Sequence, residues 1–343
     1  MSFSPEIHPP NLNADLYKVY QGANSHRILT FIDIHADGST LVGGSDQNGR
    51  YWEGMVDYTT CPTEFLGNIN NVMSTSMENS VTDGRFLANS SRMVICDDKG
   101  DIRVWMKGLI WSEISGTGNE QDTWSNTAGA SDHDSAILAI DLFPGEENVA
   151  VTGGADNCIK IWDLTNMLPT TSYAPAHTYM VSDVACNPSI ANTFVSSSLD
   201  GSVAVWDTKS SETLAKVYRG PPCGARCVCW MSDTVFAIGY DNGDVNVHDM
   251  RQDIPGSNVF SLTRDFPIEK LEYNAESKML GLVGDTNTVS VYEVGATSDL
   301  KLVFQDSNHT DYVRGLSWDK TNKGILYSVG WDDNILQHSI IVP

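Results

Sequence analysis

The chain has 343 residues, of which 41% are hydrophobic, so there is enough apolar material to bury a large core. Asp and Glu number 44 against 21 Lys and Arg, which gives a formal net charge of −23. A surface this acidic repels phosphate backbones, so direct nucleic-acid binding is not expected. No apolar run is long enough for a membrane span. The charge suits basic partners, and it also favours simple solubility.

The N-terminal residues 1–15 are polar and contain several prolines, and we predict a tail there. A basic region followed by an apolar run is missing, so no secretory signal is expected and the protein is predicted to be intracellular. Residues 16–22 (LYKVYQG) closely resemble residues 214–220 (LAKVYRG). The similarity predicts that both segments occupy the same position in a repeat.

A repeated pattern runs along the rest of the chain, consisting of a turn with Asp followed by an alternating strand that ends in an aromatic residue or His. The last residues of these strands are at positions 52, 105, 162, 206, 248, 292 and 338. The intervals are 53, 57, 44, 42, 44 and 46 residues. A four-stranded propeller blade needs roughly 40–45 residues, so the first two intervals predict insertions.

One such copy cannot bury both of its faces, and the copies must therefore stack around a ring. We predict an all-β fold, a seven-bladed β-propeller that forms a single domain over 16–343 and resembles the WD-repeat proteins. The seventh copy has only three strands before the chain ends. Residues 16–22 are therefore predicted to pair into the last blade and close the ring.

Residues 111–132, between blades two and three, are rich in Ser, Gly, Asn, Thr and acids, and include Trp111 and Trp124. The composition favours a polar loop insertion. The alternative is an acidic arm whose tryptophans anchor a basic partner.

Several histidines invite a catalytic interpretation, because His is the usual general base. Three of them instead precede the first strand of a copy by the same offset, and the WD-repeat resemblance implies that each is linked to a Ser or Thr, a turn Asp and a strand Trp. The implied bracing residues are His133, Thr152, Asp156 and Trp162; His177, Ser196, Asp200 and Trp206; and His309, Ser328 and Asp332, with His338 in place of Trp. Sets that recur in this way indicate internal braces rather than a single catalytic triad.

Other motifs give little support for a chemical site. Cys223, Cys227 and Cys229 lack the spacing of a zinc site, and Cys227 and Cys229 are predicted to be core residues of a strand. The glycosylation patterns at Asn89 and Asn308 are short enough to occur by chance. We predict no catalytic residue, cofactor or metal.

A narrower resemblance comes from the last and first copies. Residues 309–314 (HTDYVR), Trp318, residues 328–332 (SVGWD) and the terminal His338 resemble the final repeat of the methylosome protein 50 family. Residues 49–54 (GRYWEG) resemble the blade-one signature Gly-Arg-x-Trp-x-Gly of that family. The family implies a WD-repeat partner of the protein arginine methyltransferase that makes symmetric dimethylarginine.

The resemblance implies a non-catalytic scaffold in a hetero-oligomer, in the cytoplasm and the nucleus. It would bind the N-terminal barrel domain of the methyltransferase and present basic substrates, namely histone tails and Sm-type proteins. Arg50 and Trp52 are the predicted partner interface, because they project from the same face of a strand and belong to residue types enriched at interface hot spots. Trp52 also occupies the predicted bracing position of blade one, although Val42 replaces the usual Ser or Thr.

The main alternative is a substrate receptor of a cullin-type ubiquitin ligase, which often carries a WDxR motif. Residues 206–209 (WDTK) and 248–251 (HDMR) each lack one defining residue. A propeller enzyme is a second alternative, but no acid–base pair supports it.

Overall fold

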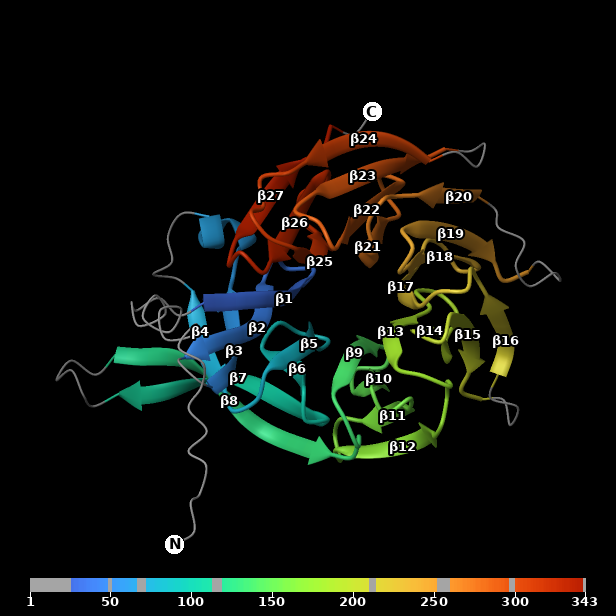
Figure 1. Ribbon diagram of the computed structural model, residues 1–343. Helices are drawn as coiled ribbons and strands as arrows, with labels where there is room; N and C mark the ends of the chain where they lie inside the picture. Colours follow the sequence, from blue (N-terminus) through green and yellow to red (C-terminus); the bar gives the residue numbers. More distant parts are fainter. Residues whose placement is uncertain are drawn as a thin grey trace, which may run out of the picture.

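The computed structural model describes residues 26–48, 51–66, 72–112, 119–209, 214–251, 260–295 and 300–341. Within these ranges the chain forms seven antiparallel sheets around a central channel, and the predicted all-β, seven-bladed propeller is confirmed (Figure 1). The predicted tail 1–15 and the closing segment 16–22 lie outside the described residues, so the closure of the ring stays a prediction.

Each blade is a sheet whose strands follow chain order. Blades one to three consist of β1 (His26–Ile34), β2 (Thr40–Asn48), β3 (Tyr51–Thr59) and β4 (Met73–Met77); β5 (Val81–Phe86), β6 (Arg92–Asp97), β7 (Asp101–Ser112) and β8 (Asn119–Ser131); and β9 (Ile137–Leu142), β10 (Val149–Gly154), β11 (Ile159–Asp163) and β12 (Leu168–Tyr173). Blades four and five consist of β13 (Val181–Cys186), β14 (Thr193–Ser198), β15 (Ser202–Asp207) and β16 (Leu214–Arg219); and β17 (Ala225–Trp230), β18 (Val235–Tyr240), β19 (Asp244–Asp249) and β20 (Phe260–Thr263). Blades six and seven consist of β21 (Ile268–Asn274), β22 (Met279–Gly284), β23 (Val289–Val294) and β24 (Leu300–Asp306); and β25 (Val313–Trp318), β26 (Ile325–Gly330) and β27 (Ile335–Ser339). A short 3-10 helix, η1 (Pro62–Leu66), lies between β3 and β4.

The first strand of each blade is the innermost, and these seven strands are neighbours around the channel. Because adjacent strands are antiparallel, the loop entering each inner strand and the turn between the second and third strands lie on one face of the ring. We call this the top face. The remaining two turns of each blade lie on the bottom face.

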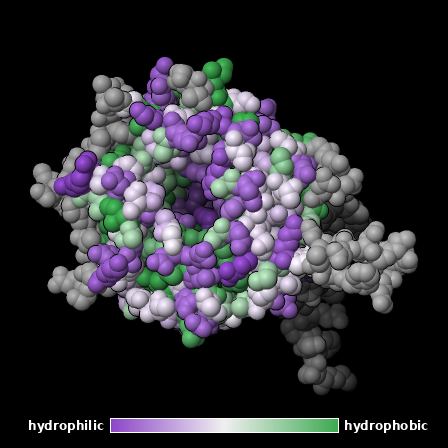
Figure 2. Space-filling view, turned by 180° about the vertical axis from the view of Figure 1, so that it is seen from behind, coloured by the Kyte–Doolittle hydropathy of each residue, from purple (hydrophilic) through white to green (hydrophobic). Residues whose placement is uncertain are grey.

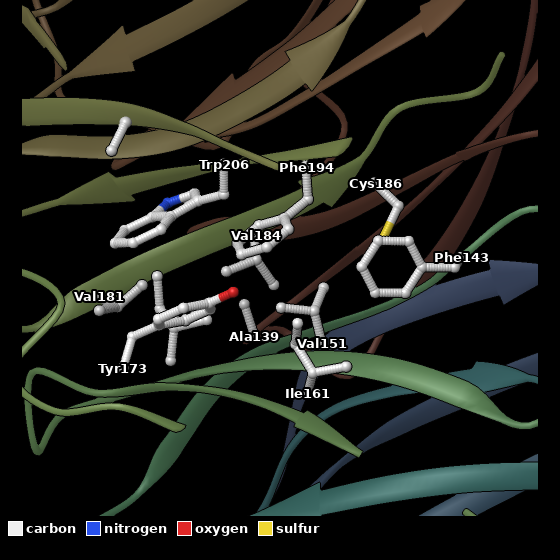
Figure 3. Packing of buried hydrophobic residues seen from close by; sticks show 12 residues of the cluster. Ala139, Phe143, Val151, Ile161, Tyr173, Val181, Val184, Cys186, Phe194 and Trp206 are labelled. Atoms are coloured by element: carbon white, nitrogen blue, oxygen red, sulfur yellow. The ribbon is translucent and has the colours of Figure 1, made fainter. Parts of the chain in front are cut away.

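The core is divided into clusters between neighbouring blades. Between blades three and four, Val151 and Ile161 face Phe194 and Trp206 (Figure 3). The rings of Phe194 and Trp206 are stacked, with centroids 5.8 Å apart, and Tyr173 stacks on the same indole at 4.8 Å. Alternate residues of a strand point to opposite faces, so each blade contributes side chains to two such clusters.

Two glycines show why the blades pack so closely. At Gly153, an added Cβ would lie 2.5 Å from Val181 of the next blade, so only Gly permits the observed approach. At Gly201, φ is 82°, in the left-handed region that favours Gly, and the residue forms the turn between β14 and β15. Gly is therefore required at both positions, at Gly153 by close packing and at Gly201 by a tight turn.

The predicted loop insertion at 111–132 is corrected by the structure. Residues 119–131 form β8, which pairs with β7 along its whole length, from Asp101 opposite Ser131 to Ser112 opposite Asn119. The long hairpin projects beyond the ring (Figure 1). Trp124 is 5% exposed and packs edge-on against Tyr58 of blade one, so it is a core residue and not an anchor for a partner.

Candidate functional site

The histidine of blade three is held in a buried relay between the top-face turn and the blade interior. His133 Nδ1 lies 2.8 Å from the Asp156 carboxylate, and His133 Nε2 lies 2.8 Å from Thr152 Oγ1. The same hydroxyl accepts a hydrogen bond from Trp162 Nε1 at 2.8 Å. The imidazole is completely buried, and both of its ring nitrogens are hydrogen-bonded to internal partners. It therefore cannot reach a substrate.

Blades four and seven contain equivalent relays with small differences. His177 Nε2 lies 2.7 Å from Ser196 Oγ, which accepts a hydrogen bond from Trp206 Nε1. Its Nδ1 contacts Ser202 at 2.9 Å, and the Asp200 carboxylate is farther away, at 3.6 Å.

In blade seven, His309 Nδ1 lies 3.0 Å from Asp332 and its Nε2 lies 2.7 Å from Ser328. His338 Nε2 takes the place of the indole, 2.8 Å from the same hydroxyl.

The hydroxyl of the relay is confined to these three blades among the described residues. In the other four blades the strand register places an aliphatic residue at this position: Val42, Ile95, Ile238 and Leu282. The relay is therefore an optional brace of a blade and does not mark one shared site.

We expect the turn carboxylates to make stability depend on acid pH. Burial acts to raise the pKa of Asp200, but hydrogen bonds from Ser202 and Thr178 outweigh burial and lower it to about 2. A carboxyl group with a lowered folded-state pKa stabilises the fold above its unfolded pKa, and this stabilisation is lost as the pH falls from about 4 towards 2. Asp200→Asn should remove on the order of 2 kcal/mol at pH 6 and reduce the loss between pH 5 and pH 3, as measured by urea unfolding at each pH. A variant with the same acid dependence as the wild type would contradict this role.

The predicted interface residue Trp52 does not occupy the bracing position of blade one. The register of β2 and β3 pairs Thr40 with Thr59, and it pairs Gln47 with Trp52. The position equivalent to Trp162 is therefore Thr59, and the expected brace at Trp52 is wrong.

The difference arises from the length of the hairpin between the second and third strands. From Val42 to Thr59 there are 17 positions, whereas there are 10 from Thr152 to Trp162, so this hairpin of blade one is seven residues longer. Trp52 lies on the extension and is 45% exposed. Arg50 lies outside the described residues, so its predicted orientation beside Trp52 stays untested.

Carboxylates of the inner strands connect neighbouring blades around the channel. Each inner strand is the edge of its sheet. The backbone amides on its unpaired side, which faces the channel, therefore need hydrogen-bond acceptors. Asp33, Asp83, Asp141 and Asp183 accept hydrogen bonds from the backbone amides of Phe86, Ile140, Cys186 and Val228, each in the following blade, at 2.7–3.1 Å. These four carboxylates were not predicted from the sequence, although a charged residue within a short apolar strand is an unusual signal.

Cys227 and Cys229 both belong to the inner strand β17, whereas Cys223 precedes it. Cys227 is buried, as predicted, and Cys229 lines the channel. Burial raises the pKa of Cys229 to about 12, so its thiol stays protonated at neutral pH. Among the described residues, no group of three or more His, Cys, Asp or Glu side chains is arranged to hold a metal ion. The described part of the chain also contains no helix that is both long and apolar enough to span a membrane.

Comparison with known proteins agrees with the architecture. The family "WD domain, G-beta repeat" matches residues 126–163 and 169–207. Methylosome protein WDR77 of Xenopus laevis is 26% identical over 89% of this chain and 87% of that protein. A guanine nucleotide-binding protein subunit beta of Arabidopsis thaliana is 23% identical over 65% of this chain and 61% of that protein. Histone acetyltransferase type B subunit 2 of Candida glabrata is 23% identical over 55% of this chain and 36% of that protein.

The seven blades and the matched repeats define a WD-repeat β-propeller protein. Within this class, the similarity to methylosome protein WDR77 along most of both chains supports assignment to the methylosome protein 50 family. The resemblance drawn from blades one and seven is thereby confirmed.

Proposed function

We propose that this protein is a non-catalytic scaffold that binds a protein arginine methyltransferase through blade one and presents basic substrates to it. The observation that carries the proposal is the half-exposed indole of Trp52. It lies on the hairpin between the second and third strands of blade one, which is longer than the equivalent hairpin of every other described blade. An exposed Trp on a strand has the properties of an interface hot spot. The register of blade one gives the indole no bracing role to explain its presence.

The net charge of −23 supports the second half of the proposal. Histone tails and Sm-type proteins carry basic segments, and an acidic surface accelerates their encounter with the complex. The similarity to a protein named as a methylosome component supports the same assignment. The proposed complex is a hetero-oligomer in the cytoplasm and the nucleus, with the barrel domain of the enzyme against Arg50 and Trp52.

The contact is tested by Trp52→Ala. Truncating a hot-spot Trp typically costs about 2–4 kcal/mol, so affinity for the purified methyltransferase should fall by roughly 30-fold to 1,000-fold in titration calorimetry. The melting temperature should stay unchanged, because the indole is not part of the core.

Leu168→Ala is a matched control, since Leu168 is 62% exposed and belongs to blade three. It should bind the enzyme as the wild type does. Intact binding of Trp52→Ala, or a large fall in its melting temperature, would contradict the proposed contact.

The ubiquitin-ligase alternative receives no support from its nearest motif. Residues 248–251 have His248 where the motif requires Trp, and the exposed Arg251 pairs with Asp249 at the end of β19. Affinity purification from cells followed by mass spectrometry separates the two functions. Recovery of an arginine methyltransferase supports the proposal, and recovery of a cullin adaptor instead would overturn it.

A further inference from the structure

The channel of the propeller encloses a cavity with a volume of about 980 Å³, at the upper end of the range of ligand sites. Figure 2 shows that the ring is hollowed at its centre and that hydrophilic residues gather at the rim and in the depth. The channel belongs neither to the histidine relays nor to the blade-one hairpin.

The charged side chains of the channel form three levels, because each inner strand contributes equivalent positions around its bulge. At the top level, Arg226 and Arg314 are paired with Glu269 and Asp285. At the middle level, Arg85 Nη1 lies 2.7 Å from Asp83, and Lys270 Nζ lies 3.2 Å from Asp183. Arg226, Arg314, Arg85 and Lys270 are thus paired with carboxylates of the top and middle levels.

The bottom level has an excess of negative charge. Asp33, Asp141 and Glu272 stand at the same position of their strands, three residues after the unpaired bulge residue, as does Arg85. Arg85 is directed to the middle level and is 3.8 Å from Asp141. A further cation, Lys320, is an exposed residue of the bottom-face turn and also lines the channel.

Glu272 is the least satisfied of these carboxylates. Its Oε2 is shielded from solvent and has no hydrogen-bond partner. Burial raises the pKa of Glu272 to about 7, despite the opposing effect of Lys320, and burial also raises the pKa of Asp141. The carboxylate accepts a hydrogen bond from the Trp318 backbone, so only Oε2 is left unpaired. A buried carboxylate oxygen without a partner is costly, and a cation brought by a ligand would reduce that cost.

We propose that the bottom mouth of the channel binds the guanidinium group of an arginine side chain from a basic peptide, with Glu272 as its principal acceptor. The guanidinium group is always charged and carries five donors in a planar fork, which suits several carboxylate oxygens around one opening. The peptide approaches from the bottom face, because the carboxylates of the top level, Asp241, Glu269 and Asp285, are all paired with Arg226 or Arg314. This site deepens the proposed function, since a scaffold that presents basic substrates must hold them.

The test measures binding of a fluorescein-labelled peptide of alternating Gly and Arg to the full chain by fluorescence anisotropy. A hydrogen bond to a charged group is worth enough that Glu272→Gln should weaken binding by about 10-fold or more. Lys320→Ala, which removes the competing exposed cation, should strengthen it. A peptide with Gln in place of Arg should bind Glu272→Gln and the wild type with the same affinity.

Glu276→Gln is the matched control, because it removes the same charge from the bottom face outside the channel, where Glu276 is exposed and pairs with Lys323. It should change affinity less than about 2-fold, as expected for a screened surface charge. Equal affinity of Glu272→Gln and the wild type would overturn the proposal, as would equal losses in Glu272→Gln and Glu276→Gln. The assay contains no methyltransferase, so its failure would leave the Trp52 contact standing, and failure of that contact would leave the channel site standing.

Discussion

Asp183→Ala should lower the free energy of unfolding by about 3 kcal/mol, because it removes the anion that joins three blades at the channel. Asp183 is 3% exposed, and its carboxylate accepts the amides of Val184 and Val228 at 3.1 Å each. Both of its oxygens lie 3.2 Å from Lys270 Nζ of blade six. Burial acts to lower the pKa of Lys270, but the charge of Asp183 opposes burial and the pKa is raised overall. The ammonium group therefore stays charged and loses its partner in the variant.

Urea unfolding of three further variants separates the ion pair from a general effect of mutation. Asp183→Asn keeps one acceptor oxygen and should lose less than Asp183→Ala. Combining Asp183→Ala with Lys270→Met should recover part of the loss, because it removes the unpaired charge. Glu276→Ala, at an exposed ion pair, should stay within about 0.5 kcal/mol of the wild type. If the free energy of unfolding of Asp183→Ala also stayed within about 0.5 kcal/mol of the wild type, the carboxylate would not connect the blades.

The repeat could be predicted from the sequence because every blade needs the same alternation and the same turn. Positions 105, 162, 206, 248, 292 and 338 all share one register in the structure. Position 52 was misplaced because Trp52 has the residue type of the brace, while strand pairing assigns that position to Thr59. Residue type identifies a repeat, but only register shows where an insertion lies within it.

The hairpin of blade two was also missed, for a different physical reason. Ser, Gly, Asn and Thr favour loops when they stand alone, and residues 119–131 contain many of them. Pairing with β7 satisfies their backbone groups along the whole strand, and the burial of Trp124 against Tyr58 stabilises the middle of the hairpin. These cross-strand contacts are not local, so composition could not indicate them.

Of these features, the channel site is the hardest to predict from the sequence. Arg85, Asp141 and Glu272 are separated by more than fifty residues each, and only the bulges of seven inner strands bring them to one level. Which of their charges is compensated depends on contacts between blades. The sequence signal is limited to a charged residue within each of these short strands.

Thr152→Val should lower the free energy of unfolding by about 2–6 kcal/mol, although the two side chains have nearly the same shape. The substitution removes the hydroxyl that holds His133 and Trp162, so two buried polar groups are left without a partner, at about 1–3 kcal/mol each. Thr152→Ser keeps the hydroxyl and should lose much less. An aliphatic residue is tolerated at this position where the relay is absent, as Ile95 shows in blade two. Adding His133→Leu to Thr152→Val should therefore cost less than the two single changes together, measured by a double-mutant cycle of urea unfolding. Strict additivity of the two changes would show that the histidine and the threonine stabilise the blade independently.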